Sequence, residues 1–224
     1  MKTLTLNLII LSMSIIFSVR SNAQSDQYVS AMKTNLEKMA TQGESFQSLS
    51  ASFERIALAE KNQWLPYYYA AYANVVQSFG LTVADERDKA LDQAQKFLDA
   101  ALNLKSDSSE CMALQGYLHV AHLQIDPMTR GGEYVNKATE SFDKAIALNP
   151  ENPRGYYLKG ITVMHTPDFM GGGKASAKPI LTLAMAKFET FKPASPFSPN
   201  WGKENCKKQV LACERSIMYL LFVN

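Results

Sequence analysis

Three histidines are the first residues in this chain that could do chemistry. His119 and His122 are three residues apart, so they share one side of a helix, and His165 could join them from another helix. A protein zinc site needs three or four ligands in a fixed geometry. No carboxylate stands at ligand spacing on the same face, and the H-E-x-x-H pattern of zinc proteases is absent. A metal-binding protein or a hydrolase that uses these histidines is therefore only the alternative function.

The other chemical candidate is the sequence GGGKAS at residues 171–176. A phosphate-binding loop has the pattern G-x4-G-K-[ST] between a strand and a helix. Here Ala175 follows the lysine, Asp168 takes the first glycine position, and no strand is predicted before the segment. The glycines instead predict a loop with positive φ angles that leads into a helix. No G-x-S-x-G elbow is present, and the acidic residues are scattered over helix faces. We therefore predict no enzyme activity, no metal and no cofactor.

The cysteines Cys111, Cys206 and Cys213 form no recognisable reactive pair. Cys206 and Cys213 are seven residues apart, which is about 10 Å along one helix. That distance exceeds the reach of a disulfide. Cys111 could meet either of them only if the chain folds back. We expect three buried thiols that act as small apolar side chains.

Residues 1–23 have the features of a signal peptide. Lys2 precedes an apolar run from Leu4 to Val19, and a small-x-small site ends at Ala23. The run is short for a membrane span, although an uncleaved anchor is the alternative. We therefore predict a periplasmic or secreted protein with no membrane insertion after signal cleavage.

The remaining residues, 24–224, suit one domain with a sizeable core. Loss of the leader removes two basic residues and leaves 21 basic and 21 acidic residues. A surface without net charge gives no reason to expect nucleic acid or an anionic membrane as a partner.

Helical spacing of apolar residues divides this domain into nine segments. They are 24–40, 44–61, 66–79, 84–104, 110–124, 133–148, 153–165, 174–191 and 203–222. Gly, Pro, Asp and Ser separate them, and no stretch alternates with the period of a strand. The predicted fold class is all-α.

Two markers recur at an interval of about 45 residues. Small residues stand at Ala71, Gly116 and Gly160, where two helices could cross closely. Triplets of small and large apolar residues begin at positions 49, 94, 138 and 184. The two markers agree, so we predict four antiparallel helix pairs and a closing helix.

The best-defined unit has the spacing Ala138-x3-Phe142-x2-Ala145-x4-Pro150, followed by a helix containing Gly160. This spacing resembles a tetratricopeptide (TPR) repeat, although that repeat is about 34 residues long. The surplus falls in connecting segments such as 126–132 and 167–173. With the segments WLPYYYAAY and FKPASPFSPNWG, the chain is similar to a group of exported repeat proteins of Bacteroidetes-type bacteria without assigned activity. The resemblance implies a right-handed helix-pair solenoid.

The same resemblance implies that the leading helices line a concave groove. The groove positions it gives for a binding site are Tyr68, Tyr72, Tyr117, Tyr157, Ile161, Met164 and His165. Tyrosines offer a large apolar area and a hydroxyl, which suits a surface that holds a partner. We therefore predict an exported, non-enzymatic binding or scaffold module that holds a peptide or protein partner. Two alternatives stay open: the groove is filled by the first pair or the last helix, or the chain is a structural assembly component.

Overall fold

The computed structural model describes residues 26–104 and 106–222, with side chains through residue 215. The predicted signal peptide, residues 1–23, lies outside the described residues. Within the described ranges the regular structure is entirely helical, which confirms the predicted class. None of the described helices combines the length and the apolar character that a bilayer crossing requires.

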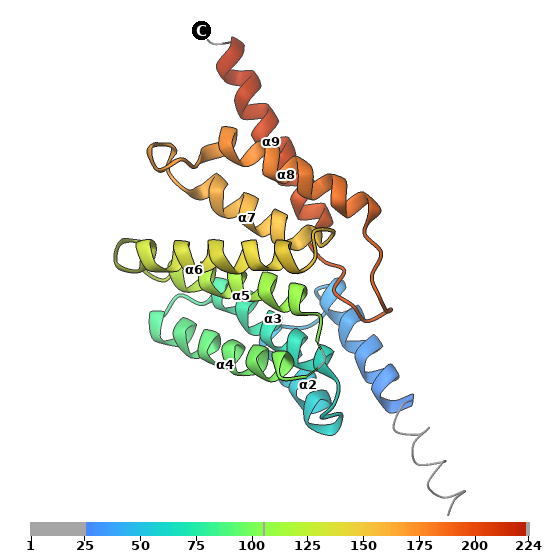
Figure 1. The fold of residues 1–224 in the computed structure, drawn as a ribbon. Helices are drawn as coiled ribbons and strands as arrows, with labels where there is room; N and C mark the ends of the chain where they lie inside the picture. Colours follow the sequence, from blue (N-terminus) through green and yellow to red (C-terminus); the bar gives the residue numbers. More distant parts are fainter. Residues whose placement is uncertain (1–25, 105, 223–224) are drawn as a thin grey trace, which may run out of the picture.

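The described α-helices follow the order of the predicted segments (Figure 1). The first helix covers residues 26–40. The others are α2 (Phe46–Ala59), α3 (Trp64–Gly80), α4 (Ala84–Leu102), α5 (Ser108–Leu123), α6 (Pro127–Leu148), α7 (Pro153–His165), the short 3-10 helix η1 (Asp168–Met170), α8 (Gly173–Thr190) and α9 (Lys203–Phe222). The bounds of α7 and α9 are those the sequence predicts, and Asn152 and Pro153 explain the start of α7. The Asn152 side chain accepts a hydrogen bond from the backbone N–H of Arg154, and Pro153 suits a first turn.

The prediction was wrong about the start of α6. The helix begins at Pro127, so the Gly131-Gly132 pair lies inside it and not in a loop before residue 133. The Asp126 side chain accepts hydrogen bonds from two backbone N–H groups, those of Met128 and Thr129, both at 3.2 Å. This cap and the proline at the first position start the helix early enough to outweigh the two glycines.

The helices pack as hairpins whose leading members lie side by side. α3 packs on α4, α5 on α6 and α7 on α8, while α3 contacts α5 and α5 contacts α7. The recurring small residues lie within these hairpins. A Cβ at Gly116 would stand 2.2 Å from the Phe142 ring, and one at Gly160 would stand 2.7 Å from Leu181. The predicted close crossings are therefore confirmed.

Two buried apolar clusters divide the core. One joins the first helix and α2–α5, and the other joins α5–α9. The residues that open the last three predicted triplets, Ala94, Ala138 and Ala184, are all fully buried. Cys111, Cys206 and Cys213 are also buried and free, as small apolar side chains would be.

The segment between α8 and α9 positions the candidate site. Residues 191–202, called the strap below, leave the end of α8 and run past the start of α3 and the first helix (Figure 1). Ser195 and Ser198 close a turn within it, with their hydroxyl oxygens 2.9 Å apart. Gly202 has φ +105°, a conformation that favours glycine, and it returns the chain into α9.

Candidate functional site

The predicted tyrosines gather on one wall formed by the leading helices. Tyr68 and Tyr72 come from α3, Tyr117 from α5 and Tyr157 from α7. Burial, which disfavours the phenolate, raises the pKa of Tyr117 to about 12 and raises the pKa values of the other three further. The four hydroxyls are therefore neutral hydrogen-bonding groups.

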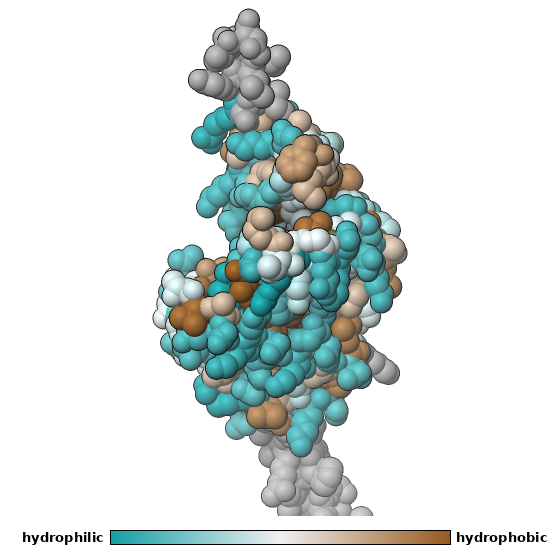
Figure 2. All heavy atoms as spheres, turned by 90° about the vertical axis from the view of Figure 1, so that its left-hand side faces the viewer, coloured by the Kyte–Doolittle hydropathy of each residue, from teal (hydrophilic) through white to brown (hydrophobic). Residues whose placement is uncertain are grey.

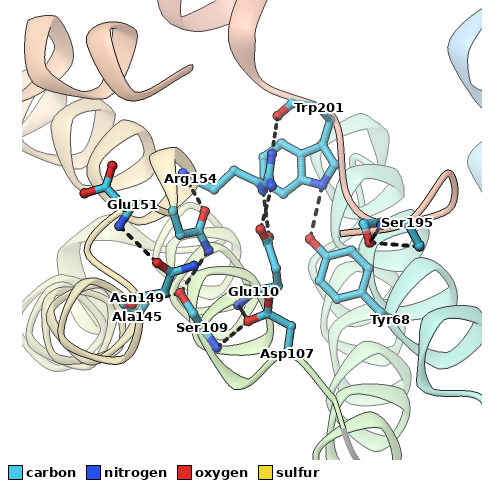
Figure 3. Close-up of polar contacts among 12 residues, drawn as sticks. Tyr68, Asp107, Ser109, Glu110, Ala145, Asn149, Glu151, Arg154, Ser195 and Trp201 are labelled. Carbon is cyan, nitrogen blue, oxygen red and sulfur yellow. Dashed lines mark hydrogen bonds and ion pairs between the residues drawn. The ribbon is translucent and has the colours of Figure 1, made fainter. Parts of the chain in front are cut away.

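The strap covers part of this tyrosine wall. The Trp201 ring lies 4.9 Å from the Tyr72 ring and 6.3 Å from the Tyr117 ring, measured between centroids. The indole N–H of Trp201 donates a hydrogen bond of 3.1 Å to the hydroxyl of Tyr68 (Figure 3). Tyr68 is fully buried and Tyr157 is 6% exposed, so neither presents a phenol to a partner in this conformation. Tyr72 and Tyr117 remain half-buried.

The other predicted positions lie further along α7. Ile161 and Met164 are half-buried, and His165 is exposed at the end of the helix. The Met164 sulfur lies 3.8 Å from the thiol of Cys213, so α9 packs beside it. Partner binding by these residues, and by the tyrosines, stays a prediction.

A buried charge pair holds the strap to the leading helices (Figure 3). The Arg154 guanidinium donates to both carboxylate oxygens of Glu110, at 2.7 and 2.5 Å, and its third nitrogen donates to the Trp201 carbonyl at 3.2 Å. The side chains of Arg154 and Glu110 are 0% and 3% exposed. Burial raises the pKa of Glu110, against the lowering effect of the Arg154 hydrogen bonds. Through the Trp201 carbonyl, this pair ties the strap to α5 and α7.

Sequence analysis missed this pair, although the sequence contained a signal for it. Glu110 and Arg154 are 44 residues apart, which is one repeat interval, and each lies in the first turn of a leading helix. Equivalent positions on adjacent stacked helices lie side by side, so opposite charges there predict an ion pair. A hydrogen bond of 3.0 Å from Asn152 to Ser109 joins the same two helix starts, one to two residues earlier in the chain.

A second concave feature lies between the first helix and α2. It is a groove of about 660 Å³, within the roughly 300–1,000 Å³ typical of small-molecule sites. Its lining residues are Gln27, Tyr28, Ala31, Thr34, Asn35, Lys38, Ser52, Arg55, Ile56, Ala59 and Glu60. Apolar side chains therefore share the groove with the cationic groups of Lys38 and Arg55. The sequence gave no angle between the first two helices, so the groove was not predicted.

Tyr28 is the one aromatic side chain in that lining. Its pKa rises to about 12, mainly because of burial and further because of the nearby carboxylate of Glu60. The phenol is therefore neutral near physiological pH. The Phe197 ring of the strap meets the Tyr28 ring edge to face at a centroid distance of 5.9 Å.

Two of the three histidines of the alternative metal hypothesis, His119 and His122, make other contacts. His122 lies 3.2 Å from a carboxylate oxygen of Asp88, which also binds Arg130, and the His119 ring contacts Gln115. Burial lowers the pKa of both histidines, that of His119 to about 4. Across the described residues, no cluster of three or more His, Cys, Asp or Glu side chains is placed to hold a metal.

The face on the left-hand side of Figure 1 carries separate apolar spots among mostly hydrophilic residues (Figure 2). Three large apolar side chains are strongly exposed: Met128 in the first turn of α6, and Phe169 and Met170 in η1, between α7 and α8. Gly171 and Gly173 have φ angles of +83° and +89°, so the GGGKAS glycines serve the turn into α8, as predicted.

Comparison with known proteins shows a similarity to a solved structure. No protein-family model and no curated protein matches the chain. Among solved structures, the chain is similar to the HusA haemophore from Porphyromonas gingivalis, with a TM-score of 0.75 and 28% sequence identity. The match covers 84% of this chain and 94% of the haemophore. The chain therefore shares its all-helical fold with nearly the whole of a binding protein from a Bacteroidetes species.

Proposed function

We propose that this chain is an exported, non-enzymatic binding protein that takes up a planar tetrapyrrole such as haem. The similarity to a haemophore over 94% of that protein's length carries the proposal. A carrier needs a site that binds its cargo without transforming it. The absence of a recognisable catalytic motif in the sequence agrees with such a role.

The groove between the first helix and α2 fits a tetrapyrrole in size and in chemistry. Its volume of about 660 Å³ suits a cofactor-sized molecule. Tyr28, Ala31 and Ile56 offer apolar contact to a flat ring system, whose burial from water favours binding. Lys38 and Arg55 offer positive charge to the propionate groups of haem.

Tyr28 is the groove residue whose type is known to ligate haem iron. Ligation would displace the phenol proton, and burial, which raises the pKa of Tyr28 to about 12, makes that displacement costlier than at an exposed tyrosine. Without ligation, the phenol presents its ring face and a hydroxyl to the ligand. Contacts to the porphyrin ring, rather than a protein–iron bond, therefore supply most of the affinity in this proposal.

The architecture in this proposal is a TPR-like, right-handed solenoid formed by residues 24–224 after removal of the signal peptide 1–23. Such export would place the protein in the periplasm or outside the cell. The stacking of three helix hairpins with adjacent leading helices supports the solenoid. The similarity to a haemophore supports export.

A second candidate is a peptide or protein partner held on the tyrosine wall. The half-buried Tyr72 and Tyr117 and the exposed His165 favour it, because the strap leaves them partly accessible. Both candidates describe a non-enzymatic binding module. They differ in the surface used and in the ligand.

A haem titration with two matched tryptophan variants tests the groove. Ala59 is exposed and lines the groove, whereas the adjacent Leu58 is exposed and does not. Ala59→Trp fills the groove without entering the core, so we expect haem affinity to fall about ten-fold or more. Leu58→Trp adds the same ring outside the groove and should bind as wild type does. No absorbance change on adding haem to the wild-type protein would reject the function; equal binding by both variants would reject the groove.

A further inference from the structure

The strap reaches the wall of the groove through Phe197. Two hydrogen bonds fix the strap to α3, one at the Phe197 backbone and one at Trp201. The Tyr69 hydroxyl donates to the Phe197 carbonyl at 2.9 Å, and the Trp201 indole donates to the Tyr68 hydroxyl at 3.1 Å. The strap is therefore held in place on α3, and the first helix can pack against it.

Phe197 touches the groove lining without belonging to it. Its ring meets that of Tyr28 at 90°, the edge-to-face arrangement that aromatic pairs favour, and it is absent from the residues that line the groove. The groove is lined by residues of the first helix and α2 and by Glu60, which follows the end of α2. The position of Tyr28 thus sets the shape of one wall.

We propose that Phe197 is a positioning residue, which holds Tyr28 in the orientation that the tetrapyrrole contacts. This inference rests on the proposed function. The anchored carbonyl fixes the Phe197 backbone, and the edge-to-face contact fixes the Tyr28 ring. A segment about 170 residues away in the sequence thereby determines the geometry of the binding groove.

The same contacts connect the groove to the tyrosine wall. Phe197 and Trp201 lie four residues apart on the strap, and Trp201 stacks on Tyr72. Arg154 holds the Trp201 carbonyl. A ligand that contacts Tyr28 in this orientation therefore favours the conformation in which the strap covers part of the tyrosine wall.

A double-mutant cycle measured by haem titration tests the proposal. Phe197→Ala should weaken haem binding by about two- to ten-fold, the range expected for one aromatic pair. The control Asn200→Ala changes an exposed strap residue and should leave affinity unchanged. In a Tyr28→Leu background, Phe197→Ala should cause no further loss, because its target is already absent.

Thermal unfolding of each variant separates positioning from stability. If Phe197→Ala fails to fold, Phe197→Leu keeps the apolar volume, removes the ring and should show the same loss of affinity. An equal loss in the Tyr28→Leu background would overturn the proposal, because Phe197 would then act through general stability. If the wild-type protein binds haem and Phe197→Ala binds it equally well, the positioning role of Phe197 is overturned but the proposed function is not. No haem binding by the wild type would reject the proposed function itself.

Discussion

Replacing Glu110 by Gln should destabilise this fold far more than the loss of any surface ion pair. The change leaves the Arg154 charge in a site where its side chain is 0% exposed. Removing one partner of a buried pair costs about 3–5 kcal/mol, because the remaining charge has neither water nor a counter-ion. Gln can still accept one hydrogen bond from Arg154, so we expect the lower half of that range.

The assay is urea unfolding followed by the helical circular dichroism signal. With a urea dependence of about 2 kcal/mol per molar, a loss of about 3 kcal/mol lowers the midpoint by about 1.5 M. The matched control is Glu189→Gln, which removes an ion pair with Lys203. In that pair the Lys203 side chain is 43% exposed and the Glu189 side chain is 58% exposed. We expect that control to cost less than about 1 kcal/mol.

A double replacement completes the test. Glu110→Leu combined with Arg154→Met removes both charges, and apolar residues of similar volume should recover most of the lost stability. It cannot restore the bond from Arg154 to the Trp201 carbonyl, so a local loosening of the strap should remain. If Glu110→Gln costs no more than Glu189→Gln, the reasoning about burial is refuted.

The other predictions concern packing, pH and ligand choice. Gly116→Ala should destabilise by about 1–3 kcal/mol, because its Cβ would stand 2.2 Å from Phe142, whereas Gly131→Ala meets nothing within 4 Å and should stabilise by about 0.5–1 kcal/mol in urea unfolding. The pKa of His119 is about 4 in the fold against 6.5 ordinarily, so its contribution to stability is full above pH 6.5 and is lost as pH falls toward 4. His119→Gln should flatten that part of the pH dependence of the urea midpoint. Iron-free protoporphyrin should bind less than about ten-fold more weakly than haem in parallel titrations, because the proposed contacts of the groove are to the porphyrin ring and its propionates, which both ligands have; a larger gap would indicate ligation.

The sequence predicted the helices and their repeat well because both depend on local patterns. Apolar spacing, capping residues and prolines fix where helices begin and end, and α7 and α9 match their predicted bounds. Gly116 and Gly160 predicted the close crossings because only glycine permits them at those distances. The start of α6 was missed because a Gly-Gly pair was given more weight than the Asp126 cap.

The candidate site was less predictable because it depends on contacts between distant segments. The resemblance to TPR repeats implied which face of α3, α5 and α7 points inward, but gave no course for the strap. Trp201 therefore occupies space that the sequence assigned to a partner. The groove beside Tyr28 depends on the angle between the first helix and α2, which no residue pattern determines.

The most direct test of the central claim is a nuclear magnetic resonance titration of the isotope-labelled protein with ferric haem. The paramagnetic iron broadens amide signals near it, and iron-free protoporphyrin serves as the diamagnetic control. We predict that broadening concentrates at residues 27–38 and 52–60, around the groove. Broadening centred on Tyr72, Tyr117 and Tyr157 instead would contradict the account and place the ligand on the tyrosine wall.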